Sequence, residues 1–308
     1  MPILFKKENF SNKELLLKIK KTKFLKEMAN ASIQKVEKKE GESKGSNVFA
    51  ALAIVTCLIV GFLVWKFIMG HSSNFEGGDN TGHPLPGNYL GMVYKGGFVV
   101  PILMGLFLMS VVFSIERFLV ITKAAGKGNV ETFVKKVQKQ ISTGNIAEAM
   151  AECDKQQGTV ANVVKAGLLK YEEVKREGFD SERAEAAIQQ EIEEATSLEM
   201  PMLEKNLVVI STLVSIGTLM GLLGTVTGMI KAFSALGAGS TPDSAQLANG
   251  ISEALINTAT GIATSTLAVI AYNAFTSKID KLTYSIDEAG FTIAQTYRRF
   301  RARANSNA

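Results

Sequence analysis

The sequence predicts an all-α membrane protein with four transmembrane helices, and three observations support this class. Apolar residues make up 46% of the 308 residues, and they are gathered in long runs instead of recurring at the period of a soluble helix or strand. The mean hydropathy of +0.15 is high for a soluble domain. Four of the runs are about 20 residues or longer, enough for a helix to cross ~30 Å of hydrocarbon. We therefore expect a polytopic protein with long helices that extend into the cytoplasm.

The predicted regions follow one another without a large soluble domain. They are a basic N-terminal segment (1–47), a first span (48–70), a periplasmic loop (71–97), a second span (98–121), a helical cytoplasmic region (122–204), a hairpin of two spans (205–275, with spans Leu207 to Ile230 and Ala254 to Phe275) and a C-terminal tail (276–308). Four crossings place both termini on one side of the membrane.

The distribution of basic residues identifies that side. Lysines crowd the segment before the first span, and Lys278, Lys281 and Arg298 follow the last one, whereas Lys95 is the only lysine or arginine of the loop 71–97. Basic residues next to a membrane are retained in the cytoplasm. We therefore expect both termini and the region 122–204 to be cytoplasmic.

The first span is expected to be a retained anchor. Its apolar core is longer than that of a signal peptide, and no small-residue cleavage pattern closes it before Lys66. Two interpretations of the segment 1–47 stay open. Apolar residues such as Phe10, Leu15 and Ile19 could form one face of a helix that lies on the anionic inner leaflet, or the segment is a partly disordered tail whose lysines only fix topology.

The periplasmic loop and the cytoplasmic region differ in character. We expect irregular backbone in the loop, because Gly77-Gly78 and Pro84 interrupt regular structure. The cytoplasmic region has helical periodicity, with turns at Gly144-Asn145 and Gly158-Thr159. Its expected helices are Val130 to Ile141, Ile146 to Gln156, Val160 to Glu177 and Ser181 to about Leu203.

The third span carries small residues on one face and hydroxyls on another. Its glycines follow an i, i+4, i+7, i+11 pattern and are Gly217, Gly221, Gly224 and Gly228. Small residues at this spacing let membrane helices approach closely, so this face is expected to pack against a helix. The hydroxyl face carries Ser211, Ser215, Thr218 and Thr225.

The fourth span carries a polar line in an otherwise apolar run. Glu253, Asn257, Thr260 and Thr264 fall within about 40° of a common direction on an ideal helix. Such a line can face a water-filled lumen, or it can hydrogen-bond to neighbouring helices. We favour the lumen, because a carboxylate in a membrane span survives when it faces a bundle interior, a partner or a water path. Ion movement is thus the leading hypothesis.

Lys231 admits two interpretations. If the third and fourth spans form a hairpin that turns near Pro242, Lys231 and Glu253 lie level with each other and could form an ion pair. Alternatively, Lys231 ends the third span and extends its ammonium group into the membrane interface. We favour the second interpretation.

No arrangement of residues predicts catalysis, a cofactor or a metal. The sequence has no Gly-rich phosphate loop and no nucleophile with a paired base. His71 and His83 are too few for a metal site, and Cys57 and Cys153 lie in different regions. The acidic residues Glu191, Glu193, Glu194 and Glu199 lack the ligand pattern of a calcium loop. We expect neither an enzyme nor a nucleic-acid-binding protein.

Several motifs resemble the MotA/TolQ/ExbB proton-channel family, and ExbB most closely. They are Gly221-Leu222-Leu223-Gly224-Thr225-Val226-Thr227-Gly228-Met229 in the third span, Gly250-Ile251-Ser252-Glu253-Ala254-Leu255 and Thr258-Ala259-Thr260-Gly261 in the fourth, and Glu116-Arg117 with the stretches from Gly144 and Val164 before them. The resemblance extends from about Phe98 to Lys281. The additional first span, Asn257, Thr260 and Lys231 depart from the common pattern of that family.

The resemblance implies a homopentamer whose inner-lining helices are the third and fourth spans. It implies that these helices surround a single-span partner like ExbD or TolR, whose aspartate is the principal protonated group. It further implies that proton flow moves this partner, and that a TonB-like protein carries the work to outer-membrane transport. Glu253, Thr225 and Thr258 correspond to functional polar residues of the family. On an ideal helix, however, Thr258 points about 140° away from Glu253.

Other outputs stay open at this point. A TolQ-like system for envelope maintenance and a motility motor would use the same mechanism. A non-conducting membrane scaffold would use the glycines and threonines for assembly alone. The coupling ion could be sodium instead of a proton, since hydroxyls and a carboxylate can bind either.

Overall fold

The computed structural model describes residues 48, 50–237 and 244–306. The chain divides into two compact units, residues 1–52 and 53–308. In the first unit, the described residues 48 and 50–52 are helical. The predicted segment 1–47 and the turn at Pro242 lie outside the described residues. The remainder of this description concerns the second unit.

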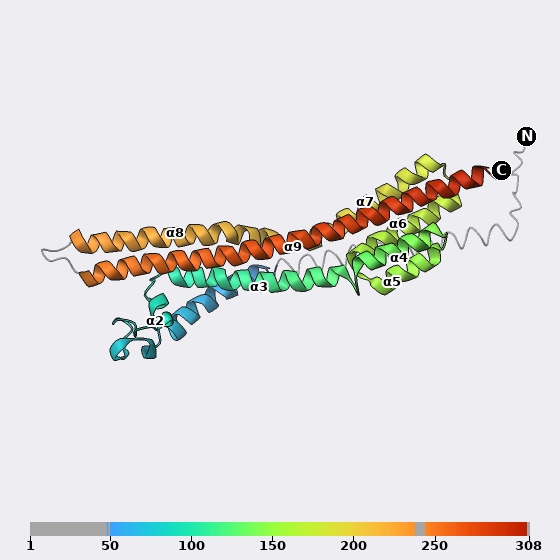
Figure 1. Ribbon diagram of the computed structural model, residues 1–308. Coiled ribbons are helices and arrows are strands. Elements are labelled where there is room, and N and C mark those ends of the chain that lie inside the picture. Colours follow the sequence, from blue (N-terminus) through green and yellow to red (C-terminus); the bar gives the residue numbers. More distant parts are fainter. Residues whose placement is uncertain (1–47, 49, 238–243, 307–308) are drawn as a thin grey trace, which may run out of the picture. The chain divides into compact units, whose positions relative to one another are not determined.

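The described part of the chain is built of helices, which confirms the predicted all-α class (Figure 1). Helical residues 50–63 continue into a π-helical turn, η1 (Val64–Met69), and two 3-10 turns follow, η2 (Ser72–Asn74) and η3 (Glu76–Gly78). The α-helices are α2 (Tyr89–Tyr94), α3 (Val99–Ala125), α4 (Val130–Ser142), α5 (Ile146–Gln156), α6 (Gly158–Glu177), α7 (Ser181–Glu204), α8 (Leu207–Gly237) and α9 (Ser244–Ser306).

Four helical segments within the described residues are long and apolar enough to cross a membrane. The first is Ala50–Met69, and the others include α3, α8 and the first part of α9. Each overlaps one of the four predicted spans, and the first two begin one or two residues later than predicted. The chain is a membrane protein.

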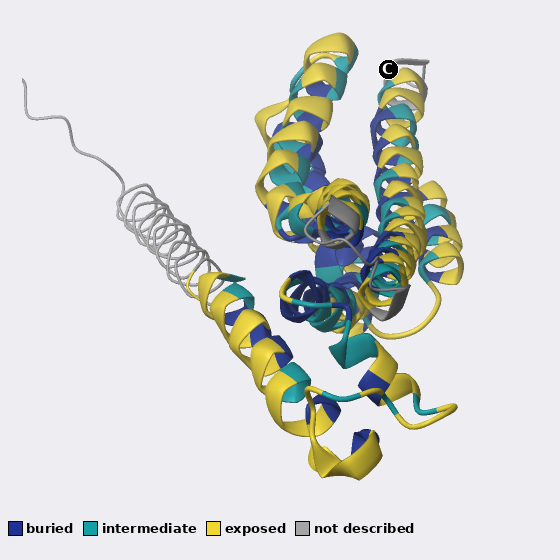
Figure 2. Cartoon of the chain, turned by 90° about the vertical axis from the view of Figure 1, so that its left-hand side faces the viewer, coloured by how far each residue is buried: buried dark blue, intermediate teal, exposed yellow. Residues whose placement is uncertain are grey.

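The helices α8 and α9 lie side by side, and α3 packs against both of them (Figure 1). The first span contacts α3 through two glycines, because a Cβ atom added to Gly61 would lie 2.6 Å from the backbone nitrogen of Gly105. Most of the surface of the first span is exposed (Figure 2). Its apolar side chains therefore face away from the rest of the protomer, as expected of a helix in contact with lipid.

The long helix α9 differs from the prediction of a span followed by a separate tail. It continues without interruption for 63 residues, about 95 Å, and so includes most of the region 276–308. Beyond the predicted span, its buried apolar side chains lie mostly three or four positions apart and are Ile279, Leu282, Ile286, Ala289, Ile293, Ala294 and Tyr297. This amphipathic spacing continues the helix because the buried face packs on other helices.

The C-terminal half of α9 packs against α4, α6 and α7 (Figure 1). The observed helices α4 to α7 agree with the predicted bounds within two residues. Their ends have clear local causes: Asn129 caps α4, Asp180 caps α7, and Gly178 ends α6 in the left-handed conformation. The hydroxyl of Tyr297 lies 3.3 Å from the carbonyl oxygen of Val174, which ties α9 to α6.

The loop before α3 has a small core of its own. Phe75 is only 2% exposed, and the ring of Tyr94 stacks on Trp65 with a centroid distance of 4.8 Å. The side-chain amide of Asn74 donates to the carbonyl oxygens of Ile68 and Met69 at 2.8 and 2.9 Å. The backbone is otherwise irregular, as predicted, but the sequence patterns did not identify the short helix α2.

The buried side chain of Arg117 joins α3 to the C-terminal end of α7. Its guanidinium group donates to the carbonyl oxygens of Met202 and Leu203, each at 3.2 Å, and it pairs with Glu116. The last carbonyls of a helix have no partners within the helix, so a cation that donates to them stabilises that end. Arg117 thereby fixes the position from which α8 begins.

Candidate functional site

The glycine face of α8 lies directly against α9. A Cβ atom added to Gly221 would lie 3.1 Å from the Cα of Gly261, and one added to Gly228 would lie 2.8 Å from the backbone nitrogen of Ala254. Gly217 and Gly224 likewise contact α9. Because the backbones approach this closely, polar groups on the two helices come within hydrogen-bonding distance.

The first polar contact is the ion pair between Lys231 and Glu253. The Nζ of Lys231 on α8 lies 2.6 Å from Oε1 of Glu253 on α9. The lysine side chain is 57% exposed, whereas the glutamate side chain is 10% exposed. The favoured interpretation, in which Lys231 only extends into the interface, is therefore wrong: the hairpin geometry brings the two charges together, while the exposed part of the lysine keeps contact with the surroundings.

A turn of two glycines before α3 covers Glu253 from another side. Gly97 has a φ of +79°, and a Cβ atom at this position would lie 2.1 Å from Oε1 of Glu253. Only a glycine permits both this backbone conformation and this approach. The preceding residue, Gly96, accepts a hydrogen bond of 2.9 Å from the side-chain nitrogen of Asn257.

Asn257 is fully buried between α8, α9 and this turn. Its Cβ lies against Gly224, where an added Cβ atom would be only 2.3 Å away. Its nitrogen is used by Gly96, but its oxygen Oδ1 has no hydrogen-bond partner. A buried polar atom without a partner costs about 1–3 kcal/mol. Such an atom calls for a functional or structural explanation.

The other two residues of the polar line bond to their own helix. Thr260 donates to the carbonyl of Ile256 and Thr264 to that of Thr260, each at 2.9 Å. Asn257 and Thr264 are both 0% exposed. The expected lumen-facing line therefore needs a correction at these two positions: they lie inside the chain, because α3 and α8 cover this face of α9.

A second polar contact lies on a different face of the α8–α9 pair. The hydroxyls of Thr225 and Thr258 hydrogen-bond to each other, and both residues are partly exposed. Thr258 also donates to the carbonyl of Ala254 at 3.2 Å. The pair does not contact Glu253, in keeping with the angle of about 140° that separates Glu253 from Thr258 on an ideal helix.

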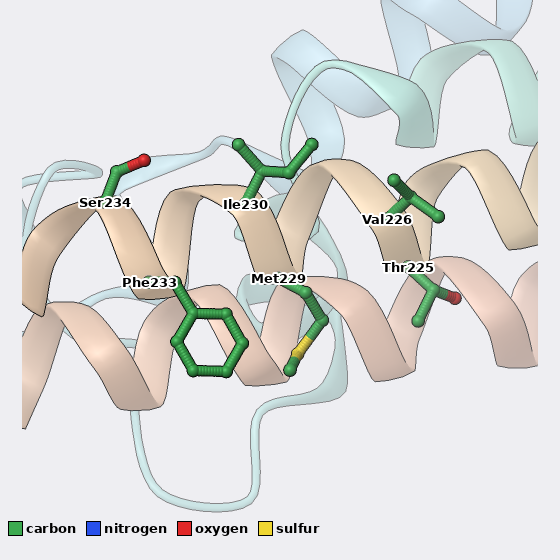
Figure 3. A pocket seen from close by; sticks show the side chains of 6 residues that line it. All are labelled: Thr225, Val226, Met229, Ile230, Phe233 and Ser234. Carbon is green, nitrogen blue, oxygen red and sulfur yellow. The ribbon is translucent and has the colours of Figure 1, made fainter.

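Thr225 also lines a shallow pocket on the surface of α8 (Figure 3). The other lining residues come from the same helix and are Val226, Met229, Ile230, Phe233 and Ser234. In Figure 3, Thr225 and Met229 point to the side of α8 where α9 runs, and Val226 and Ile230 point to the other side. Thr225 of the hydroxyl pair thus borders a largely apolar outer surface.

The hydroxyl face of α8 and the remaining candidate residues show simpler contacts. Thr218 donates to the hydroxyl of Ser265 at 2.9 Å, which adds one more bond between α8 and α9. Cys57 and Cys153 are buried free thiols. No group of three or more potential metal ligands occurs among the described residues.

Sequence reasoning did not identify Gly96 and Gly97 as part of the site. Two consecutive glycines directly before an apolar run are a visible signal of a tight turn. Their contact with residues more than 150 positions away depends on how α3 packs against α9, which local patterns do not encode.

Part of the chain that contains this site is similar to known proteins. Residues 155–288 match the family model described as the MotA/TolQ/ExbB proton channel family. This segment contains α6, α7, α8 and about the first two thirds of α9. It therefore contains the polar contacts between α8 and α9 described in this subsection.

Individual relatives carry names from two branches of that family. The chain is 33% identical over 111 residues to the biopolymer transport protein ExbB-like 3 of Synechocystis, covering 35% of this chain and 53% of the relative. It is 24% identical over 194 residues to an ExbB homolog of Methanothermobacter thermautotrophicus, covering 63% and 65%. It is 32% identical over 124 residues to the Tol-Pal system protein TolQ of Pseudomonas aeruginosa, covering 40% and 54%.

The chain thus spans between about half and two thirds of the length of these relatives. The matched residues 155–288 include the glycines of α8, Glu253 and the pair Thr225 and Thr258. Through residues 155–288, this chain is similar to the MotA/TolQ/ExbB proton channel family.

Proposed function

We propose that this protein is an ExbB-like subunit of an inner-membrane proton channel that works as a molecular motor. The observation that carries the proposal is Glu253, a buried carboxylate in the α8–α9 hairpin that pairs with Lys231. An ionisable group buried in a membrane span is costly unless it serves a purpose such as ion movement. The family match over the same hairpin supports a proton as the ion.

In this mechanism Glu253 binds and releases protons. Lys231 stabilises its ionised form by charge, and the turn Gly96-Gly97 limits the water that reaches it. The pair Thr225 and Thr258 offers hydroxyls on the opposite side of the hairpin, where they could pass protons toward a partner. The chain itself has no second carboxylate in the described part of this hairpin, which agrees with a partner that supplies one.

We propose that five copies of the chain surround a single-span protein like ExbD or TolR, with both termini in the cytoplasm. Proton flow would move this partner, and a TonB-like protein would transmit the work to transport across the outer membrane. A TolQ-like role in envelope maintenance is the alternative output, and relatives named TolQ support it. Deletion of the gene distinguishes the two: impaired uptake of TonB-dependent substrates supports the first, whereas detergent sensitivity with normal uptake supports the second.

The channel is tested by proton flux in proteoliposomes that contain this chain and its single-span partner under an imposed proton gradient. Glu253→Gln should reduce the flux at least tenfold, because the amide cannot exchange a proton. Asp287→Asn is the matched control, since it removes one carboxylate from an exposed position of the same helix. This control should conduct like the wild type.

Other results have definite meanings. Equal flux in the wild type and Glu253→Gln would keep the channel and give Glu253 a structural role. The absence of flux from an intact complex would favour a scaffold, in which the glycines and hydroxyls only assemble helices.

A further inference from the structure

Asn257 holds a hydrogen-bond acceptor that no group in the described part of the chain uses. The residue is 0% exposed, and its Oδ1 has no donor within reach. Buried polar atoms are almost always paired, so the exception points to a donor that is present only in another state of the protein. This inference rests on the proposed function, in which Glu253 takes up protons.

The orientation of Asn257 is fixed by its surroundings. Its amide nitrogen donates to the carbonyl oxygen of Gly96 at 2.9 Å. Only the nitrogen of the amide can donate to a carbonyl, so Oδ1 must be the free end. The side chain cannot move toward α8, because its Cβ already lies against Gly224.

Glu253 is a polar side chain on the same face of α9. The two residues are four apart, which places them one above the other on a helix. Both side chains meet the same turn: Asn257 bonds to Gly96, and the carboxyl group of Glu253 lies against Gly97. The amide and the carboxyl group are therefore held at neighbouring points of one small, buried region.

We propose that Asn257 is a positioning residue that accepts a hydrogen bond from protonated Glu253. In the ionised state, Glu253 accepts from Lys231, and Asn257 Oδ1 gains nothing from it because both groups are acceptors. When one proton binds the carboxylate, an O–H bond forms, and this hydroxyl donates to Oδ1. Lys231 keeps its own protons and loses only its ionic partner. Uptake of a proton thus exchanges a partner on α8 for one on α9.

The charges around Glu253 are compatible with this exchange. Lys231 is the cation that α8 supplies. On α9 the next charged residue toward the C-terminus is Lys278, several turns away. On the segment before α3, Lys95 instead donates to the carbonyl of Thr81 at 2.8 Å. Among the described residues packed on this carboxyl group, Lys231 is therefore the one that competes with the proton.

Infrared difference spectroscopy of the full chain in lipid nanodiscs tests this proposal as the pH is varied. The carboxylic acid band that disappears in Glu253→Gln belongs to Glu253. In Asn257→Leu this band should move to the frequency of an acid without a hydrogen-bond acceptor. The pH of half-protonation should fall by about one unit, a tenfold loss of proton affinity, since the neutral form loses its partner.

Asn257→Asp provides the opposite perturbation. It keeps an oxygen acceptor and adds a negative charge, so the pH of half-protonation of Glu253 should rise. A purely structural loosening of this region would move both variants in the same direction. Ser265→Ala, which removes a buried hydroxyl from α9 away from Glu253, is the control and should leave the Glu253 band unchanged.

The proposal is overturned if no band depends on Glu253, if Asn257→Leu leaves the band and its titration unchanged, or if Leu and Asp shift it alike. Flux measured on the same variants separates this result from the proposed function. If the titration of Glu253 shifts in Asn257→Leu but the wild type conducts no protons, the Asn257 contact is supported and the proposed channel is contradicted. If the wild type conducts protons but the Glu253 band is unaltered in Asn257→Leu, the channel is supported and the Asn257 contact is contradicted.

Discussion

The ion pair of Lys231 and Glu253 has one exposed and one buried end. Exposed ion pairs contribute ~0.2–1 kcal/mol, because water screens them and side-chain entropy opposes them. Breaking a buried pair costs more, because it leaves a charge without compensation. This pair lies between the two cases, so the stability lost when it is broken depends on which partner is removed.

We predict that Lys231→Met destabilises the protein more than Glu253→Gln does. The first variant leaves a buried carboxylate unpaired, whereas the second leaves an exposed lysine that water and lipid headgroups can solvate. A double-mutant cycle with both single variants and the double variant, read from thermal unfolding in detergent, should show a coupling of about 1 kcal/mol. Strictly additive effects would show that the two groups do not interact.

The sequence identified Glu253, Thr225 and Thr258, but not how they are partnered. Periodicity placed Glu253 and Asn257 on one line and placed Thr258 on another, and both placements agree with the contacts. It could not decide between a lumen and a protein interior for that line. That choice depends on α3, which covers the line from a distant part of the chain.

At the scale of elements, the α8–α9 pair depends on backbone contact at the glycines. The four positions are not equivalent, because different atoms oppose them. A Cβ at Gly228 would meet backbone atoms of Ala254 and Gly250 at 2.8 Å, whereas the nearest atom to a Cβ at Gly217 is the hydroxyl oxygen of Ser265 at 2.7 Å. A side chain can rotate away, but the backbone of a helix cannot move without moving the helix.

We predict that Gly228→Ala lowers the free energy of unfolding by about 1–3 kcal/mol, the usual cost of overpacking. Gly217→Ala is the matched control and should cost clearly less, because the side chain of Ser265 can rotate away from the added methyl group. Both variants gain the same helix propensity, roughly 0.5–1 kcal/mol. Equilibrium unfolding in mixed micelles compares the two variants. A greater loss for Gly217→Ala would mean that the side-chain contact is less adaptable than the backbone contact.

Helix bounds were predictable where local signals coincide with periodicity. Gly144 and Gly158 mark turns between helices that the sequence shows directly, and both have a positive φ. The continuation of α9 past the membrane was not predicted as part of the same helix, because charge and polarity there resemble a tail. Its buried face becomes evident only when α6 and α7 supply the surfaces on which it packs.

At the scale of the molecule, the helices α4 to α7 have a buried interior that includes Cys153. Burial raises the pKa of its thiol to about 12, and the nearby charge of Asp154 acts in the same direction. The folded state therefore favours the neutral thiol. The resulting stability is complete below the ordinary thiol pKa near 9 and is lost as the pH rises from there toward 12.

We predict that Cys153 in a Cys57→Ala variant reacts with iodoacetamide about a thousandfold more slowly in the folded protein than in denatured chain, measured at pH 8 by mass spectrometry. The difference follows from the smaller fraction of thiolate and from burial. On heating, the rate of reaction of Cys153 with iodoacetamide should increase at the temperature at which the helical circular dichroism signal is lost. Rapid reaction of the native protein at room temperature would contradict a packed interior around Cys153.

The uninterrupted length of α9 turns a small motion at one end into a large one at the other. Glu253 and Tyr297 lie 44 positions apart on this helix, a distance of about 66 Å. No proline interrupts the helix between them. If α9 tilts as a stiff lever by about 5° about Glu253, geometry displaces Tyr297 by ~6 Å, roughly the rise of one helical turn. A change of partner by a single carboxyl group would then displace the far end of the same helix sideways by about as much as the rise of one helical turn.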